Sequence, residues 1–188
     1  AAKISSLYDH ILCLLPFEPP YFKREGLNAS FVGHPILESS AKNGNGKKFR
    51  KLYGIKPKDI VLCFLPGSRD TEITKLIPIF LKVLMRLKQE GRKFRVVVPT
   101  HQGIIEKVKM KIKNWPGKPI LVQTESEKYD AFSASNVALA ASGTVSLELA
   151  LANVPTVIAY KLSPITAWFV KKAIKVKYIN LINLILDK

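Results

Sequence analysis

Apolar residues along this chain gather in short, nearly continuous runs, and longer segments of mixed polarity separate the runs. A run with little polar alternation is typical of a strand that is buried on both faces of a sheet. Strands of this kind pair in parallel and need crossover segments between them. The predicted strands are residues 11–15, 29–32, 60–65, 94–98, 120–123, 137–141 and 155–160.

Segments of helical length lie between these runs. Some have recognisable ends, such as Gly91 after the longest segment and Trp115-Pro116-Gly117 after the next one. Because strand and helix alternate, right-handed crossovers would build a Rossmann-like, doubly wound parallel sheet, and the fold class is α/β. The predicted helices cover residues 19–24, 47–53, 72–90, 104–114, 128–133, 145–152 and 165–175.

A polar stretch rich in turn residues interrupts this order at residues 36–46, and it is predicted to be a linker. Residues 1–35 make at most one β-α-β unit, which has too few neighbours to bury both faces of its sheet. We therefore expect residues 1–35 to be the end of a preceding domain. Residues 47–188 are expected to form a second, nearly complete domain. The absence of an initiator Met fits either a processed start or a piece of a longer protein.

The composition supports a full hydrophobic core, since 47% of the 188 residues are hydrophobic. The formal net charge of +16 would by itself suggest nucleic acid or an anionic membrane as a partner. Most of this charge is lysine, however, and lysines occur in nearly every polar segment. No zinc finger, aromatic-basic RNA motif or helix-turn-helix accompanies them, so we expect no nucleic-acid partner.

Both cysteines, Cys13 and Cys63, lie inside apolar runs, which is typical of buried free thiols in a reducing compartment such as the cytoplasm. No uninterrupted apolar stretch reaches the roughly 18 residues that a membrane span needs, and the N-terminus lacks the apolar centre of a signal peptide. His10, His34 and His101 have no partner at ligand spacing, and no Asp-x-Asp pair occurs. The sequence therefore predicts no metal site.

The turn after the third predicted strand carries candidate phosphate chemistry. The run 60–65 stops at Pro66, and Gly67, Ser68 and Arg69 follow directly before a predicted helix. Free N–H groups at a helix start, the positive end of its dipole and a guanidinium all favour a bound phosphate. The same residues also occur in ordinary connections between a strand and a helix. A second turn of this kind, Ser142-Gly143-Thr144, follows the run 137–141 and favours the phosphate interpretation.

Several further motifs occur in a fixed order along the chain. They are Leu14-Leu15-Pro16-Phe17-Glu18-Pro19, Val32-Gly33-His34-Pro35, Leu65-Pro66-Gly67-Ser68-Arg69 with Glu72-Ile73, Ala141-Ser142-Gly143-Thr144 with Leu147-Glu148, Ala159-Tyr160-Lys161, and Asn183-Leu184. In these motifs, in their order and over essentially its whole length, the chain resembles the lipid-A-disaccharide synthase family.

The resemblance implies a two-domain glycosyltransferase of the GT-B type. Such an enzyme joins UDP-2,3-diacylglucosamine to 2,3-diacylglucosamine 1-phosphate in lipid A biosynthesis, a part of lipopolysaccharide synthesis, and releases UDP. It would work without a cofactor, peripherally on the cytoplasmic face of the inner membrane. Residues 47–188 would be the Rossmann-like C-terminal domain that binds the UDP-sugar. The resemblance also implies that the catalytic base lies in the N-terminal domain, most of which this chain lacks. We expect a donor-binding part that is inactive alone.

The resemblance assigns roles to both turns. Gly67, Ser68 and Arg69, together with Ser142, Gly143 and Thr144, would bind the diphosphate of UDP. The guanidinium of Arg69 would neutralise charge on the leaving group; the alternative is a surface ion pair with Asp70 or Glu72. Glu148, about one turn into the next helix, would bind the ribose hydroxyls. Its alternative role is that of an exposed acidic residue on a helix.

Two other positions are candidates for the cleft between the domains. His34 would either hydrogen-bond the hinge or line the cleft. Asn183 matches a family position, but Ile182 stands before it where the family has Pro. Glu18 is more simply explained as an acid at a helix N-terminus. Residues 168–178 mix aromatic residues with lysines, which would suit either an interfacial helix or a helix packed on the sheet.

Two other functions remain open at this point. One is a related GT-B transferase or a UDP-sugar epimerase with another substrate. The other is a non-catalytic basic α/β module that binds nucleic acid or anionic lipid. Binding of UDP that depends on residues 67–69 would separate the first from the second, because a nucleic-acid module would instead show steep salt dependence and no response to UDP.

Overall fold

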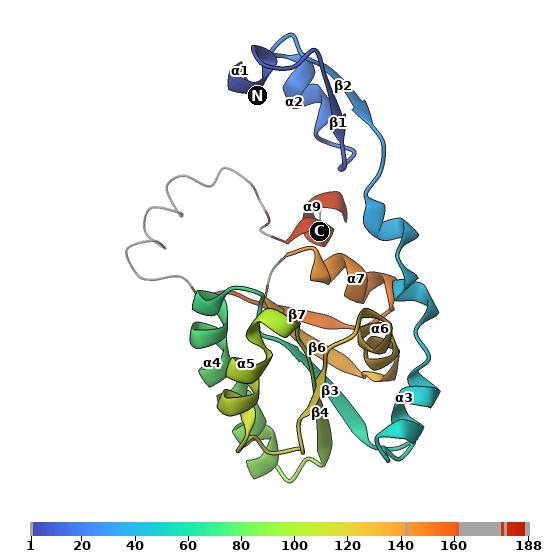
Figure 1. Cartoon of the computed structure of the whole chain (residues 1–188), viewed down its shortest axis with the longest axis vertical. Coiled ribbons are helices and arrows are strands. Elements are labelled where there is room, and N and C mark those ends of the chain that lie inside the picture. Colours follow the sequence, from blue (N-terminus) through green and yellow to red (C-terminus); the bar gives the residue numbers. More distant parts are fainter. Residues whose placement is uncertain (1, 142, 162–177, 179, 187–188) are drawn as a thin grey trace.

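The computed structural model describes residues 2–141, 143–161, 178 and 180–186, and it contains two parallel sheets (Figure 1). The smaller sheet pairs β1 (His10–Cys13) with β2 (Asn28–Phe31), and α2 (Pro19–Lys23) connects the two strands. A short helix, α1 (Ala2–Ser5), precedes them. The larger sheet contains β3 (Ile60–Leu65), β4 (Phe94–Pro99), β5 (Ile120–Val122), β6 (Val137–Ala141) and β7 (Thr156–Ala159).

The order of strands in the larger sheet is β5-β4-β3-β6-β7, and every neighbouring pair is parallel. From β3 the chain adds β4 and then β5 on one side. It then crosses back to place β6 on the other side of β3 and adds β7 next to β6. This reversal of direction between β3 and β6 defines a doubly wound, Rossmann-like sheet. The predicted fold class is confirmed.

The helices cover both faces of this sheet. Helices α4 and α5 pack on one face, while α3, α6 and α7 pack on the other (Figure 1). Their bounds are α3 (Gly46–Leu52), α4 (Asp70–Gln89), α5 (Ile105–Ile112), α6 (Glu125–Ala134) and α7 (Val145–Leu151), with α9 (Leu181–Leu186) packed near α7. Short 3-10 turns are η1 (Pro35–Glu38), η2 (Ser40–Asn43) and η3 (Gln102–Ile104).

Alternation along β3 shows why its sequence is continuously apolar. Phe64 points to the α4 and α5 face, where its ring lies 5.2 Å from that of Phe80 and 5.6 Å from that of Trp115. Cys63 and Leu65 point to the opposite face, beside α6 and α7. A strand with helices on both faces has no solvent-facing side, so polar residues are absent from it.

The predicted strands are all present, with ends within two residues of those expected. The predicted helix at 128–133 begins earlier, at Glu125, because the Thr124 hydroxyl caps it by accepting a hydrogen bond from the N–H of Glu127 (3.3 Å). The predicted helix at 165–175 lies outside the described residues, as does nearly all of the segment 168–178. No described helix is long and apolar enough to cross a membrane.

The predicted linker lies on the surface of the larger sheet's helices. Its two 3-10 turns, η1 and η2, contact α6 and α7, and Ala41 is buried there. At Gly44 and Gly46 the chain passes so close to the backbone of α6 that a Cβ atom at either position would collide with it. The division into residues 1–35, 36–46 and 47–188 stays a prediction.

Both cysteines are free and buried, as expected from their apolar surroundings. Burial raises the pKa of the Cys63 thiol to about 12, and it also raises the pKa of Cys13, to which Glu18 contributes. Neither thiol is therefore ionised near neutral pH, and reactivity as a thiolate is suppressed.

Arg50 on α3 hydrogen-bonds to the end of α6 and to the loop before β3. Its guanidinium donates to the carbonyl of Ala134 (2.8 Å) at the end of α6, and to the carbonyls of Lys56 (3.0 Å) and Asp59 (3.1 Å) before β3. It also donates to Oδ1 of Asn136 (3.1 Å), an oxygen that accepts the N–H of Val61 as well. Without the guanidinium, the partly buried carbonyls of Ala134 and Asp59 lose this donor, whereas the carbonyl of Lys56 still accepts the N–H of Asp59 (3.0 Å).

We therefore expect Arg50→Met to lower the free energy of unfolding by about 2–3 kcal/mol, since the two partly buried carbonyls of Ala134 and Asp59 would lose this donor. Lys51→Met removes the same charge from an exposed neighbouring position and should change it by less than about 0.5 kcal/mol. Urea unfolding followed by circular dichroism measures both. Equal effects of the two substitutions would show that the guanidinium contacts do not stabilise the fold.

Candidate functional site

The carboxyl ends of β3, β4, β5 and β6 open into one cavity with a volume of about 620 Å³. It lies where the strand order reverses, which is the position at which open α/β sheets bind their ligands. Leu65 of β3 is opposite Ala140 of β6, so the turns that follow these two strands leave the same edge of the sheet. Both predicted phosphate-binding turns reach the cavity: Gly67, Ser68, Arg69, Gly143 and Thr144 line it. Ser142 lies outside the described residues.

The first turn is folded around the carboxylate of Glu72. One carboxylate oxygen, Oε2, accepts the backbone N–H groups of Ser68 (3.1 Å) and Arg69 (3.3 Å), while Oε1 accepts from the Arg69 guanidinium (3.1 Å). Gly67 has a φ of +102°, and a Cβ at this position would collide with Glu72. The ion pair between Arg69 and Glu72, one of the sequence-based alternatives, is thus present. Arg69 still lines the cavity, and 79% of its side chain is exposed.

The second turn, at Gly143 and Thr144, is hydrogen-bonded to the first turn of α7. Ser146, which is buried, donates its N–H (3.1 Å) and its hydroxyl (2.7 Å) to the carbonyl of Gly143. Thr144 precedes α7 without a capping hydrogen bond from its side chain. The buried Ser146 therefore holds the start of α7 in place, and the hydroxyl of Thr144 does not cap the helix.

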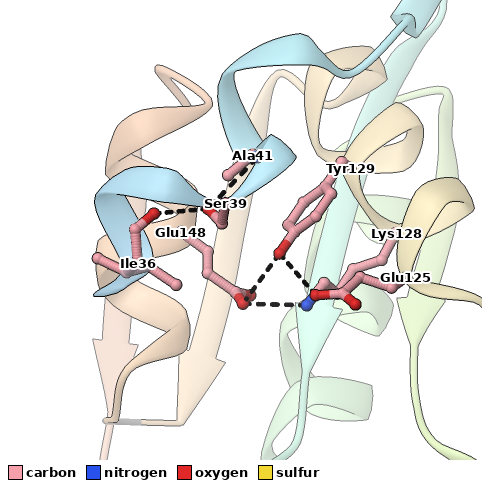
Figure 2. Close-up of polar contacts among 7 residues, drawn as sticks. All are labelled: Ile36, Ser39, Ala41, Glu125, Lys128, Tyr129 and Glu148. Atoms are coloured by element: carbon pink, nitrogen blue, oxygen red, sulfur yellow. Dashed lines mark hydrogen bonds and ion pairs between the residues drawn. The ribbon is translucent and has the colours of Figure 1, made fainter. Parts of the chain in front are cut away.

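Glu148 lies on α7 and its side chain points toward α6, as Figure 2 shows; it is one of the residues that line the cavity. Its Oε1 accepts from the ammonium group of Lys128 (3.0 Å), and the hydroxyl of Tyr129 lies 3.4 Å from the same oxygen. Only 14% of the Glu148 side chain and 24% of the Lys128 side chain are exposed. The alternative of a freely exposed helix acid is therefore wrong.

Tyr129 lies between two carboxylates. Its hydroxyl donates to Oε1 of Glu125 (3.0 Å), which is a shorter contact than the one to Glu148 (Figure 2). Burial, the hydrogen bond to Glu125 and the charges of Glu148 and Glu125 together raise the pKa of Tyr129 to about 12. The hydroxyl thus stays protonated near neutral pH and is a buried donor beside Glu125 and Glu148, which line the cavity.

The cavity has a further wall that the sequence analysis did not identify. Thr100 and His101 follow β4, and Gln123 and Thr124 follow β5. The imidazole Nε2 of His101 lies 3.4 Å from the carbonyl of Ser68, so this wall touches the first turn. A usable signal existed, because polar residues that directly follow parallel strands gather at one edge of the sheet.

The other predicted residues lie elsewhere. His34 Nδ1 accepts the N–H of Ile36 (3.1 Å) at the start of η1, and His34 is not among the residues that line this cavity. Asn183 lies on α9, which packs near α7. The Glu18 carboxylate accepts the N–H of Leu15 (2.8 Å). The described residues include no cluster of three or more His, Cys, Asp or Glu side chains suited to a metal ion. A cleft role for His34 and Asn183 stays a prediction.

A doubly wound parallel sheet with a cavity at its reversal point defines the Rossmann-like class of α/β domain. A solved structure of the same fold is the glycosyl transferase family 9 protein from Veillonella parvula, with a TM-score of 0.52 at 14% identity, over 72% of this chain and 45% of that chain. The family model described as lipid-A-disaccharide synthetase matches residues 1–188. This chain belongs to the lipid-A-disaccharide synthase family, and the predicted resemblance is confirmed.

Curated relatives agree with this assignment. The chain is 50% identical, over all of its length, to the lipid-A-disaccharide synthase of Rhodospirillum centenum, and covers 47% of that protein. It is 41% identical to the one from Paramagnetospirillum magneticum, over 98% of this chain and 48% of that protein. The chain therefore spans about half the length of the curated relatives that it matches.

The geometry of the first turn predicts an unequal effect of two glycine substitutions. Gly67→Ala should lower the free energy of unfolding by about 2–3 kcal/mol, because it combines backbone strain with displacement of Glu72. Gly91 also has a positive φ, +71°, but open space surrounds its Cβ direction, so Gly91→Ala should cost only about 1 kcal/mol. Thermal and urea unfolding measure both. A Gly67→Ala protein as stable as the Gly91→Ala protein would contradict the packing of Glu72 against this turn.

Proposed function

We propose that this chain is the donor-binding part of a lipid-A-disaccharide synthase. The complete enzyme would transfer 2,3-diacylglucosamine from its UDP donor to 2,3-diacylglucosamine 1-phosphate and release UDP. The observation that carries the proposal is the coincidence of the family assignment with a cavity at the reversal point of the sheet, lined by both Gly-containing turns. This coincidence favours a UDP-sugar transferase of this specificity over the other functions considered.

The diphosphate of UDP would lie between the two turns. Gly67 and Ser68 offer backbone from one turn, and Gly143 and Thr144, directly before α7, offer it from the other. Ser142 is included in this proposal on its sequence position alone. Arg69 would neutralise the charge that develops on the leaving diphosphate. Its exposure supports this role, because a guanidinium that is 79% exposed can reorient toward a ligand.

Glu148 would bind the ribose. Its contacts to Lys128 and Tyr129 both involve Oε1, and Oε2 has no hydrogen-bond partner among the described residues. A carboxylate fixed through one oxygen can offer the other to the 2′- and 3′-hydroxyls of a ribose. The arrangement is therefore ready before the ligand arrives, which lowers the entropic cost of binding.

The catalytic base is proposed to lie outside this chain. An inverting transfer needs a carboxylate that takes the proton from the 6-hydroxyl of the acceptor sugar. We assign that group to the N-terminal half of the enzyme, as the family resemblance implies, and we assign no cofactor or metal to the reaction. The acylated substrates imply peripheral binding to the cytoplasmic face of the inner membrane.

The ribose assignment predicts that Glu148→Gln weakens UDP binding by about 1–3 kcal/mol, since a charged acceptor becomes a neutral one. Affinity for pyrophosphate, which has no ribose, should stay unchanged. Isothermal titration of the 188-residue chain with both ligands measures this contrast. Glu106→Gln, which neutralises an acid that is 76% exposed and not among the residues lining the cavity, is the matched control.

Two results would overturn the assignment. Equal weakening of UDP and pyrophosphate would mean that the start of α7 had moved, not that a ribose contact was lost. Unchanged affinity for both ligands, with only a shift in melting temperature, would leave Glu148 with a structural role alone.

A further inference from the structure

The first turn of the cavity already contains an anion, the carboxylate of Glu72. Its oxygens accept hydrogen bonds from the backbone N–H groups of Ser68 and Arg69 and from one nitrogen of the Arg69 guanidinium, at 3.1 to 3.3 Å. Backbone N–H groups at a helix start and a guanidinium are the donors that a phosphoryl group uses in such sites. Glu72 and a bound phosphoryl group therefore compete for the same donors.

Glu72 also lines a second cavity. It has a volume of about 190 Å³, and Arg69, Glu72, Lys75 and Lys161 are among the residues that line it. Lys75 is three positions after Glu72 on α4, a spacing that places two side chains within reach on one face of a helix. Neither Lys75 nor Lys161 has an ion-pair partner among the described residues.

We propose that Glu72 closes the diphosphate site when it is empty, and that an incoming phosphoryl group displaces its carboxylate toward Lys75 and Lys161. The inference rests on the proposed function, because it names the residue that controls access to that same site. In the empty site Glu72 keeps Arg69 and the turn amides paired. In the filled site the phosphoryl oxygens take over these donors, and the two lysines compensate the displaced carboxylate.

The contrast with Glu148 supports a mobile role for Glu72. The two pairs differ in their cations: the Arg69 side chain is 79% exposed and that of Lys128 24% exposed, so the Arg69–Glu72 pair is open to solvent through its guanidinium. An exposed ion pair contributes little net stability, so it exchanges readily for a more highly charged ligand. This exchange would favour phosphorylated ligands over neutral ones, because only a ligand with enough negative charge can replace the Glu72 carboxylate.

The test is the affinity of the 188-residue chain for pyrophosphate and for UDP. Glu72→Gln removes the competing charge and should bind both ligands on the order of tenfold more tightly, the equivalent of one charge-assisted hydrogen bond. Glu72→Asp keeps the charge but is too short to reach the amides, and it should also bind more tightly. The control is Glu90→Gln, which removes a carboxylate paired with Arg86 (3.3 Å) at the far end of α4 and should change neither affinity.

A double-mutant cycle tests where the displaced carboxylate goes. Lys75→Met should weaken pyrophosphate binding in the parent chain more than in the Glu72→Gln background, where no carboxylate needs compensation. Lys82→Met removes an exposed charge farther along α4 and should have the same effect in both backgrounds. Equal effects of Lys75→Met in the two backgrounds would contradict the proposed destination.

Failure of this inference is distinguishable from failure of the proposed function. If the parent binds UDP and pyrophosphate but Glu72→Gln binds them equally well or less well, Glu72 is only a helix cap, and the inference is wrong. If Glu72 is only a helix cap, its substitution would lower the unfolding midpoint without changing the affinity for either ligand. If neither the parent nor any variant binds either ligand, both the proposed function and this inference are overturned.

Discussion

The parallel pairing of β3 with β6 is the constraint on which the candidate site depends. It places Leu65 opposite Ala140, so both turns leave the same edge of the sheet although more than seventy residues separate them along the chain. The pairing is enclosed on both faces: Cys63 and Phe64 are buried, and so are Ala138 and Ala140. The small alanines of β6 let α6 and α7 approach the sheet closely, which brings Lys128 and Glu148 together across the cavity.

Two ion pairs that differ in exposure line the cavity. The Lys128–Glu148 pair is largely enclosed and is joined by Tyr129, a donor whose raised pKa keeps it protonated. The Arg69–Glu72 pair lies on an exposed turn. A fixed wall suits the recognition of a neutral, well-defined group such as a ribose. An exchangeable wall suits a charged group whose arrival and departure accompany each reaction.

Much of this architecture could be predicted from the sequence, because strands buried on both faces leave an unmistakable apolar run. The two turns were also identifiable, since Gly67 and Gly143 stand directly after such runs. The neighbours of Glu148 could not be predicted. Apolar periodicity says that α6 and α7 pack on the sheet, but it does not say that Lys128 faces Glu148. The ion pair between Arg69 and Glu72 could not be predicted for the same reason, since Asp70 was an equally near acid. In the structure Asp70 pairs with Lys107.

The proposed function requires a nucleoside diphosphate to bind between the turns after β3 and β6. Backbone amide chemical shifts of the ¹⁵N-labelled chain, recorded during titration with UDP, test this most directly. We expect large shifts at Ser68 and Arg69 in one turn and at Gly143 and Thr144 in the other, with a common binding curve. Shifts confined to one turn, or shifts that gather on a different surface while these amides stay unchanged, would contradict it.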